Sequence, residues 1–249
     1  MKCQQCERQF SDDFNFCPQC GTAFEKEDSQ HYWLSHAREL RRKGKTRKAI
    51  EAYSRYHSLG GISAYSFKAL GELYYQLGEM DASIENFKTS IKLKPDFPDT
   101  YYYLGISYYR KANIQKSIES FEACLALNPD FVIAYYWLGI THYHAGDRKK
   151  SIESYARLLD FNPASYIANY HLGVNYSAEG KYKDAIRHFE ILLDQSDEDE
   201  AVLYHLGTAY FHSGKFSEAV DLFKKSLAKN PNDQRSQKML DYILSASDI

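Results

Sequence analysis

The chain has 249 residues, of which 44% are hydrophobic, and this is enough apolar mass for one extended domain or two compact ones. Its formal net charge of -2 argues against a dedicated nucleic-acid-binding protein, because such proteins are usually strongly basic. No stretch approaches the roughly 18 consecutive apolar residues of a membrane-spanning helix and no basic-then-apolar leader opens the sequence, so we expect a cytoplasmic protein with no membrane insertion.

The first 20 residues hold four of the five cysteines, as two copies of the pattern Cys-x-x-Cys-x-x-x-Phe. The four are Cys3, Cys6, Cys17 and Cys20. Each Cys-x-x-Cys turn can place two thiolates on one metal ion, and two such turns complete a tetrahedral four-sulfur shell. In a reducing compartment this spacing indicates a metal site rather than disulfides. Gly21 follows the second turn, where a left-handed backbone is often required, whereas Glu7 stands at the matching place after the first turn.

The stretch FCPQCG resembles the short zinc ribbons found at the head of many bacterial and archaeal proteins. The resemblance implies a ribbon over residues 1–24 that holds one structural Zn2+, because a closed four-cysteine shell has no open position. Rubredoxin-like iron is the alternative, and zinc is favoured because the segment is too short to shield a redox centre. Residues 25–29 are polar and are predicted to form a linker.

From residue 30 onward the sequence repeats itself every 34 residues. Leu-Gly recurs five times, beginning at Leu70-Gly71, and an aromatic column recurs six times, beginning at Tyr53. Apolar residues within each copy fall at helical spacing, and a glycine such as Gly78 suits a left-handed helix end. The period therefore predicts pairs of antiparallel helices, in which the Leu-Gly glycine lets the aromatic ring of the second helix approach closely.

This pattern resembles that of the tetratricopeptide repeat family, whose 34-residue unit carries Trp, Leu-Gly, Tyr, Ala, Phe and Pro at fixed positions. The resemblance covers residues 30–233 and implies an all-α fold, a right-handed α-solenoid of about six helix pairs. The units are predicted at residues 30–63, 64–97, 98–131, 132–165, 166–199 and 200–233. Residues 234–249 are predicted to form a C-terminal capping helix, with Met239, Leu240, Tyr242 and Ile243 on its buried side.

In that family, one stripe of the first helix in each pair lines a concave groove that binds partners. The candidate groove residues here are Tyr102, Ile106, Tyr109, Ile133, Tyr136, Ile140, Tyr143, Ile167, Tyr170, Val174, Tyr204 and Phe211. Two interpretations remain open: the rings pack on one another as part of the structure, or they form an apolar patch for a helix or an extended peptide. Such a segment would come from another protein, from the chain's own termini or, through self-association, from a second copy. Tyr103 fits either face.

A basic run in the first unit supplies Arg38, Arg41 and Arg42, and the same register places them at the N-terminal end of the groove. They either anchor an acidic segment of a partner, or phosphate, or form a solvated helix end. The family's clamp for acidic C-terminal tails is not supported, because Leu34 and Ala69 stand in two of its columns.

No nucleophile elbow, phosphate loop, dinucleotide fingerprint or His-Glu-x-x-His motif occurs in the sequence. His171 and His205 lie one period apart, and Cys124 is expected to be a buried thiol. We therefore predict a non-enzymatic adaptor that binds a protein or peptide segment in its groove and carries a structural zinc ribbon. The alternative is a nucleic-acid-associated factor that uses the ribbon and the basic first unit.

Overall fold

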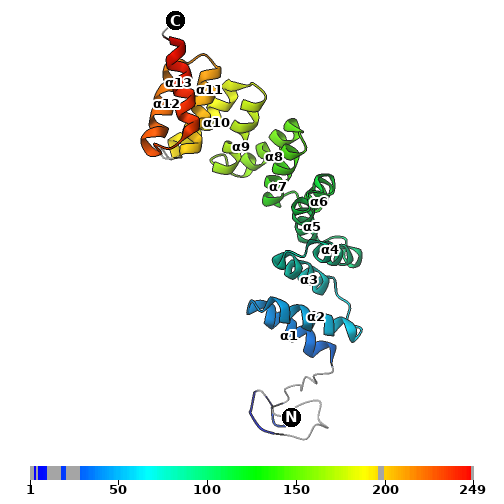
Figure 1. Cartoon of the computed structure of the whole chain (residues 1–249). Coiled ribbons are helices and arrows are strands. Elements are labelled where there is room, and N and C mark those ends of the chain that lie inside the picture. The colour runs from blue at the N-terminus through cyan, green and yellow to red at the C-terminus, as the bar shows by residue number, and fades with distance from the viewer. Residues whose placement is uncertain (1–2, 4, 10–17, 21–28, 196–198, 248–249) are drawn as a thin grey trace. The chain divides into compact units, whose positions relative to one another are not determined.

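The computed structural model describes residues 3, 5–9, 18–20, 29–195 and 199–247, and thirteen α-helices lie within this part of the chain (Figure 1). The odd-numbered helices are α1 (Gln30–Arg42), α3 (Ala64–Leu77), α5 (Pro98–Arg110), α7 (Val132–His144), α9 (Tyr166–Ala178), α11 (Glu200–His212) and α13 (Gln234–Ser247). The even-numbered helices are α2 (Thr46–Ser58), α4 (Met80–Leu93), α6 (Ile114–Leu127), α8 (Arg148–Phe161), α10 (Tyr182–Gln195) and α12 (Phe216–Lys229). Among these helices, none combines the length and the apolar character needed to cross a membrane.

The chain divides into two compact units, Met1–Lys111 and Ala112–Ile249, and each is described by itself. In the first unit, α1 packs against α2, α3 against α4, and α4 against α5. In the second unit, α7 to α12 form three pairs in the same way, successive pairs are in contact, and α13 packs against α12. The division falls between α5 and α6, inside the third predicted 34-residue unit.

The repeated glycine of a first helix lies against the repeated aromatic ring of the second helix. A Cβ atom added at Gly71 would lie 2.6 Å from the ring of Phe87, and one at Gly173 would lie 2.6 Å from the ring of Phe189. Both rings are fully buried. Because close-packed interiors do not tolerate contacts this short, only glycine fits at these positions. The predicted close approach is confirmed at both pairs.

Left-handed backbone positions follow α3 and α5. Gly78 has a φ of +81°, and Ala112, which stands 34 residues later, has a φ of +56°. At Gly78 the backbone N–H donates to the carbonyl of Tyr75 at 3.0 Å, and the N–H of Glu79 donates to the carbonyl of Tyr74 at 2.9 Å. These bonds satisfy carbonyl groups that the end of a helix leaves without partners. Alanine rarely adopts this conformation, so the sequence alone does not predict the turn at Ala112.

Buried hydroxyl groups join the second helix of a pair to the first. The hydroxyl of Ser83 donates to the carbonyl of Gly71 at 2.9 Å, and that of Ser151 donates to the carbonyl of Gly139 at 2.8 Å. Each bond satisfies two buried polar groups at the point where the helices lie closest. Cys124, on α6, is fully buried, which confirms the prediction for this thiol.

Helix α13 closes the second unit. Its Leu240 and Ile243 are buried in one cluster with Phe223 of α12. Tyr242 is 62% exposed, although its ring lies edge-on to that of Phe211 with the ring centroids 5.8 Å apart. The expectation that Tyr242 belongs to the buried side is wrong, because on a helix it is rotated by about 200° from Leu240 and about 100° from Ile243.

Candidate functional site

Three of the four N-terminal cysteines lie together. The sulfur atoms of Cys3, Cys6 and Cys20 are all within 4.8 Å of one another, and those of Cys3 and Cys20 are 3.5 Å apart. Cys17, the fourth predicted ligand, lies outside the described residues. A tetrahedral zinc ion with bonds of about 2.3 Å holds its sulfur ligands about 3.8 Å apart. The described sulfur atoms therefore have a spacing that suits zinc.

The backbone around the first cysteine pair forms a tight turn. The N–H of Glu7 donates to the carbonyl of Cys3 at 2.9 Å, and the N–H of Cys3 donates to the carbonyl of Arg8 at 2.9 Å. Hydrogen bonds from the backbone N–H groups of Cys6 and Gln5 hold the pKa of the Cys3 thiol below its usual value. Glu7 has a φ of +58°, so the left-handed conformation is present after the first turn although the residue there is not glycine.

In the second unit, three of the predicted groove tyrosines and two histidines form a continuous run of ring contacts. The ring of His171 lies 6.0 Å from that of Tyr136 and 5.5 Å from that of Tyr170, centroid to centroid. The ring of His205 in turn lies 5.7 Å from that of Tyr170 and 5.4 Å from that of Tyr204. Aromatic pairs at these distances stabilise the packing of neighbouring helices. We call these five residues, which come from α7, α9 and α11, the aromatic ladder.

The two histidines of the aromatic ladder belong to the packed core. The ring of His171 stacks on Tyr155 with centroids 4.7 Å apart, and that of His205 stacks on Phe189 with centroids 5.8 Å apart. Burial lowers the pKa of both histidines, which favours their neutral forms. Tyr170 contacts both rings. The repeated histidines are therefore packing residues rather than a ligand pair.

Aliphatic side chains lie on the same helices as the ladder. Ile133, near the start of α7, is 45% exposed, and Ile167, near the start of α9, is 49% exposed. Tyr143, near the end of α7, is also exposed. Ile140 and Val174 are half-buried and pack against the buried clusters of the second unit.

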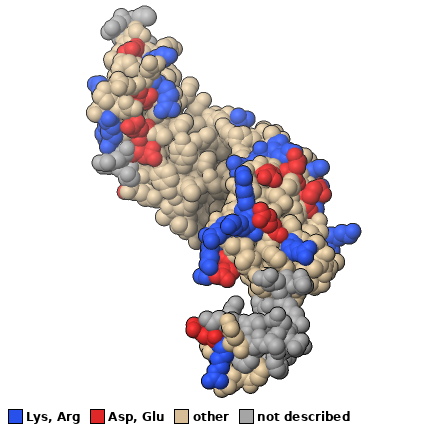
Figure 2. Space-filling view, turned by 60° about the horizontal axis from the view of Figure 1, so that its bottom comes forward, with Lys and Arg blue, Asp and Glu red and all other residues tan. Residues whose placement is uncertain are grey.

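We call the three exposed residues Ile133, Tyr143 and Ile167 the first-helix patch. On the face of the molecule seen in Figure 2, basic and acidic side chains are interspersed and a broad area carries neither.

The last predicted groove residues of the second unit lie beside α13. Phe211 is half-buried and its ring contacts that of Tyr242. The guanidinium of Arg235 lies 4.7 Å from the centroid of the Tyr204 ring, within the range of a cation–π contact. The chain's own C-terminal helix therefore covers part of this end of the predicted face.

Helix α5 carries the predicted groove residues of the first unit. Tyr102 and Tyr109 are half-buried, and Tyr103 packs against the buried cluster of this unit, so Tyr103 belongs to the core side. Ile106 is only 5% exposed, and the expectation that it lies open on a groove is wrong. The reason is that residues 104–108 are all buried, so α5 is covered on every side at this turn.

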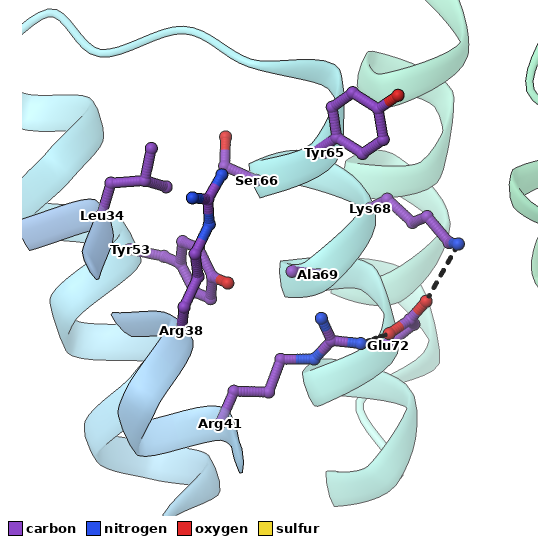
Figure 3. Close-up of a pocket in the computed structure, with 9 residues that line it drawn as sticks. All are labelled: Leu34, Arg38, Arg41, Tyr53, Tyr65, Ser66, Lys68, Ala69 and Glu72. Atoms are coloured by element: carbon purple, nitrogen blue, oxygen red, sulfur yellow. Dashed lines mark hydrogen bonds and ion pairs between the residues drawn. The ribbon is translucent and has the colours of Figure 1, made fainter. Parts of the chain in front are cut away.

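The basic residues of the first unit line a cavity of about 290 Å³ between α1 and α3 (Figure 3). Its lining residues are Leu34, Arg38, Arg41, Tyr53, Tyr65, Ser66, Lys68, Ala69 and Glu72. Of the predicted arginines, Arg38 and Arg41 line the cavity and Arg42 does not. Arg41 forms an ion pair with Glu72. The basic run therefore contributes to a defined cavity and is not only a solvated helix end.

Lys68 and Glu72 line this cavity but were not among the predicted groove residues. The ammonium of Lys68 lies 2.9 Å from the carboxylate of Asp99 and 3.6 Å from that of Glu72. Lys68 and Glu72 stand 34 residues before Tyr102 and Ile106, in the same two columns of the repeat. Both residues could therefore have been identified from the sequence, because they occupy the positions equivalent to Tyr102 and Ile106 in the preceding repeat.

Comparison with known families identifies the repeats. Residues 71–111 match a family described as TPR repeat, and residues 102–166 and 176–241 match families described as tetratricopeptide repeat. No curated protein matches the chain.

Several solved structures are similar to the chain. MamA is 26% identical with a TM-score of 0.64, and the match covers 68% of this chain and 92% of MamA. YrrB, described as a TPR protein with an unusual peptide-binding site, is 17% identical with a TM-score of 0.69, over 76% of this chain and 98% of YrrB. The pilF protein of Pseudomonas aeruginosa is 12% identical with a TM-score of 0.65, over 86% of this chain and 97% of pilF. The last two likenesses show the fold alone. The chain therefore carries tetratricopeptide repeats, the all-α architecture of protein-interaction scaffolds.

Proposed function

We propose that the protein is a non-enzymatic adaptor that binds a segment of another protein on the first-helix patch, beside the aromatic ladder. The observation that carries the proposal is the exposure of Ile133 and Ile167, one repeat apart on α7 and α9. Helical spacing (i, i+3, i+7) places Ile133 on the face of the half-buried Tyr136 and Ile140, and Ile167 on that of Tyr170 and Val174, and a contiguous apolar surface is typical of an interaction site. The peptide-binding site described for YrrB, which shares the fold, supports a peptide as the ligand.

The binding free energy expected from covering one of these isoleucines is modest, but the sum for Ile133 and Ile167 is significant. Full burial of an isoleucine contributes about 1.5–3 kcal/mol, and roughly half of each side chain is still exposed. Covering both residues therefore contributes about 2 kcal/mol, which corresponds to roughly 30-fold in affinity. Placing a carboxylate at either position costs more, because the partner would bury a charge without a counterion.

Affinity capture with a charged double variant tests the proposal. Ile133→Glu/Ile167→Glu is compared with the wild-type protein and with Leu127→Glu/Phe161→Glu as the matched control. Leu127 and Phe161 are 44% and 45% exposed, at the ends of the second helices α6 and α8. We expect mass spectrometry to recover one set of proteins with the wild type and the control but not with the first-helix variant. Equal recovery by all three folded proteins would refute the proposal.

We also propose that Cys3, Cys6, Cys17 and Cys20 hold one structural Zn2+. Support comes from the close sulfur atoms of the three described cysteines and from thiolate ligands, which suit zinc. Four thiolates fill the coordination shell, so the ion would stabilise the fold of the N-terminal segment and would have no open position for a substrate. Metal analysis of the purified protein distinguishes zinc from the rubredoxin-like iron alternative.

A nucleic-acid-associated role has less support. Arg41 and Lys43, two cations of the basic run, already pair with Glu72 and Glu39. Ion-paired side chains contribute less to phosphate binding, because their own carboxylate partners must first be displaced. Retention on heparin that falls steeply between about 50 and 200 mM salt would favour this alternative.

A further inference from the structure

The cavity between α1 and α3 has a positively charged wall. Its charged lining residues are Arg38, Arg41, Lys68 and Glu72, a net charge of +2, and Asp99, which pairs with Lys68 from outside the lining, reduces the local charge to +1. The cations come from two helices, with Arg38 and Arg41 on α1 and Lys68 on α3 (Figure 3). A wall of this kind attracts an anion, and enclosure between the helices screens the interaction less than open solvent does.

The pairing of these charges differs from residue to residue. Glu72 bridges Arg41 and Lys68, and Lys68 also contacts Asp99. No carboxylate of the described residues lies within ion-pair distance of Arg38, whose side chain extends from α1 toward Ser66 (Figure 3). Arg38 therefore offers the guanidinium that an incoming anion would meet without displacing a partner.

Neutral side chains complete the cavity. Tyr53 is buried, and burial raises the pKa of its phenol although the nearby Arg41 and Arg38 oppose this shift. The hydroxyl therefore stays protonated at neutral pH and can donate a hydrogen bond to an anion. Leu34 and Ala69 provide apolar wall, so a ligand here would combine a charged group with an apolar stem.

We propose that this cavity binds the phosphate group of a phosphorylated side chain in a protein partner, with Arg38 as its principal contact. A phosphate monoester carries a charge of about -1.5 to -2 at pH 7, which suits the guanidinium of Arg38 and the positive charge of the wall around it. Its three oxygens accept hydrogen bonds from donors on two helices at once. A peptide carboxylate fits less well, because it carries one charge and Glu72 already provides a carboxylate between Arg41 and Lys68.

The inference rests on the proposed function only in assigning the phosphate to a protein partner, so the cavity is tested first with inorganic phosphate. The full-length protein is titrated with phosphate, and with acetate at the same ionic strength, while the N–H signals of arginine side chains are followed by NMR. The variants are Arg38→Ala and Arg42→Ala. Both arginines are exposed residues of α1, but only Arg38 lines the cavity, so Arg42→Ala is the matched control.

We expect saturable phosphate binding that Arg38→Ala weakens by roughly ten-fold or more and that Arg42→Ala changes by less than about two-fold. Equal weakening by the two variants would reduce the effect to general surface charge and overturn the proposal. Acetate that binds as tightly as phosphate would also overturn it, in favour of a carboxylate ligand. Circular dichroism of both variants establishes that they are folded.

The second arm treats a partner captured by the adaptor with phosphatase. We expect the loss of phosphate to weaken capture by the wild type and to have no effect on capture by Arg38→Ala. Capture that is unaffected in the wild type would refute the assignment to a phosphoprotein. Because the first-helix patch and the cavity lie in different units, failure of the phosphate experiments leaves the effect of Ile133→Glu/Ile167→Glu intact, and the two proposals fail separately.

Discussion

Ala112 holds a left-handed backbone position that glycine occupies at Gly78 and Gly146, so Ala112→Gly is expected to stabilise the protein. A residue with a Cβ atom pays about 1–2 kcal/mol in this conformation, whereas glycine adopts it freely. Glycine also makes the unfolded chain more flexible, which costs about 0.4–1 kcal/mol. The net stabilisation is therefore about 0.5–1 kcal/mol.

Two further variants, the reverse substitution at an equivalent glycine and an alanine-to-glycine change inside a helix, serve as controls for this prediction. A Cβ atom added at Gly146 would meet nothing within 4 Å, so Gly146→Ala measures the backbone cost alone and should destabilise by about 0.5–1 kcal/mol. Ala156 is an exposed residue inside α8, where Ala156→Gly should also destabilise by about 1 kcal/mol. Urea unfolding followed by circular dichroism compares the midpoints at equal slope. If Ala112→Gly lowers the midpoint as Ala156→Gly does, the account of this turn is wrong.

Three further predictions concern packing, metal and pH. Gly173→Ala should destabilise by about 2–3 kcal/mol in urea unfolding, because its Cβ would lie 2.6 Å from the ring of Phe189, and a loss under about 0.5 kcal/mol would contradict the packing described. The purified protein should contain one zinc per chain, which a chelator removes under reducing conditions without loss of the helical signal, whereas iron or a helical collapse would contradict the proposal. Burial lowers the pKa of His142, His171 and His205 in the folded protein, so the unfolded chain binds protons more readily than the folded one. The contribution of these neutral histidines to stability is therefore complete above about pH 6.5, and it is lost as the pH falls through their lower pKa values in the folded protein. Thermal unfolding midpoints that are equal at pH 7 and pH 5 would contradict this.

The period of the sequence predicts the helices well because each repeated column has one packing role. Gly71 can face Phe87 only if α3 and α4 lie in close contact. The recurrence of these two residue types therefore predicts how the two helices pack. At Ala112 and Glu7 the residue type does not predict the backbone conformation. Both adopt positive φ because the surrounding turn requires it, although their side chains favour other conformations.

The candidate site is only partly predictable from its columns. The period places Ile106 on α5 and Ile140 on α7 at equivalent positions, yet Ile106 is buried and Ile140 is half-buried. That difference arises from the packing around α5, which a repeat pattern does not encode. For Lys68 the repeat does identify a site residue, because Lys68 stands 34 residues before Tyr102 and so occupies the equivalent position of the preceding repeat. Sequence therefore identifies the face, and the structure is needed to show which of its residues are accessible.

Site-specific photo-crosslinking shows whether a partner contacts the first-helix patch. A benzophenone amino acid is placed at Ile167, on the first-helix patch, or at Phe161, which is similarly exposed at the end of α8, and the full-length protein is irradiated in its own cell extract. We expect a defined adduct with another protein from position 167 and none from position 161. Adducts of equal yield from both positions, or none from position 167 in the folded protein, would contradict the proposed function.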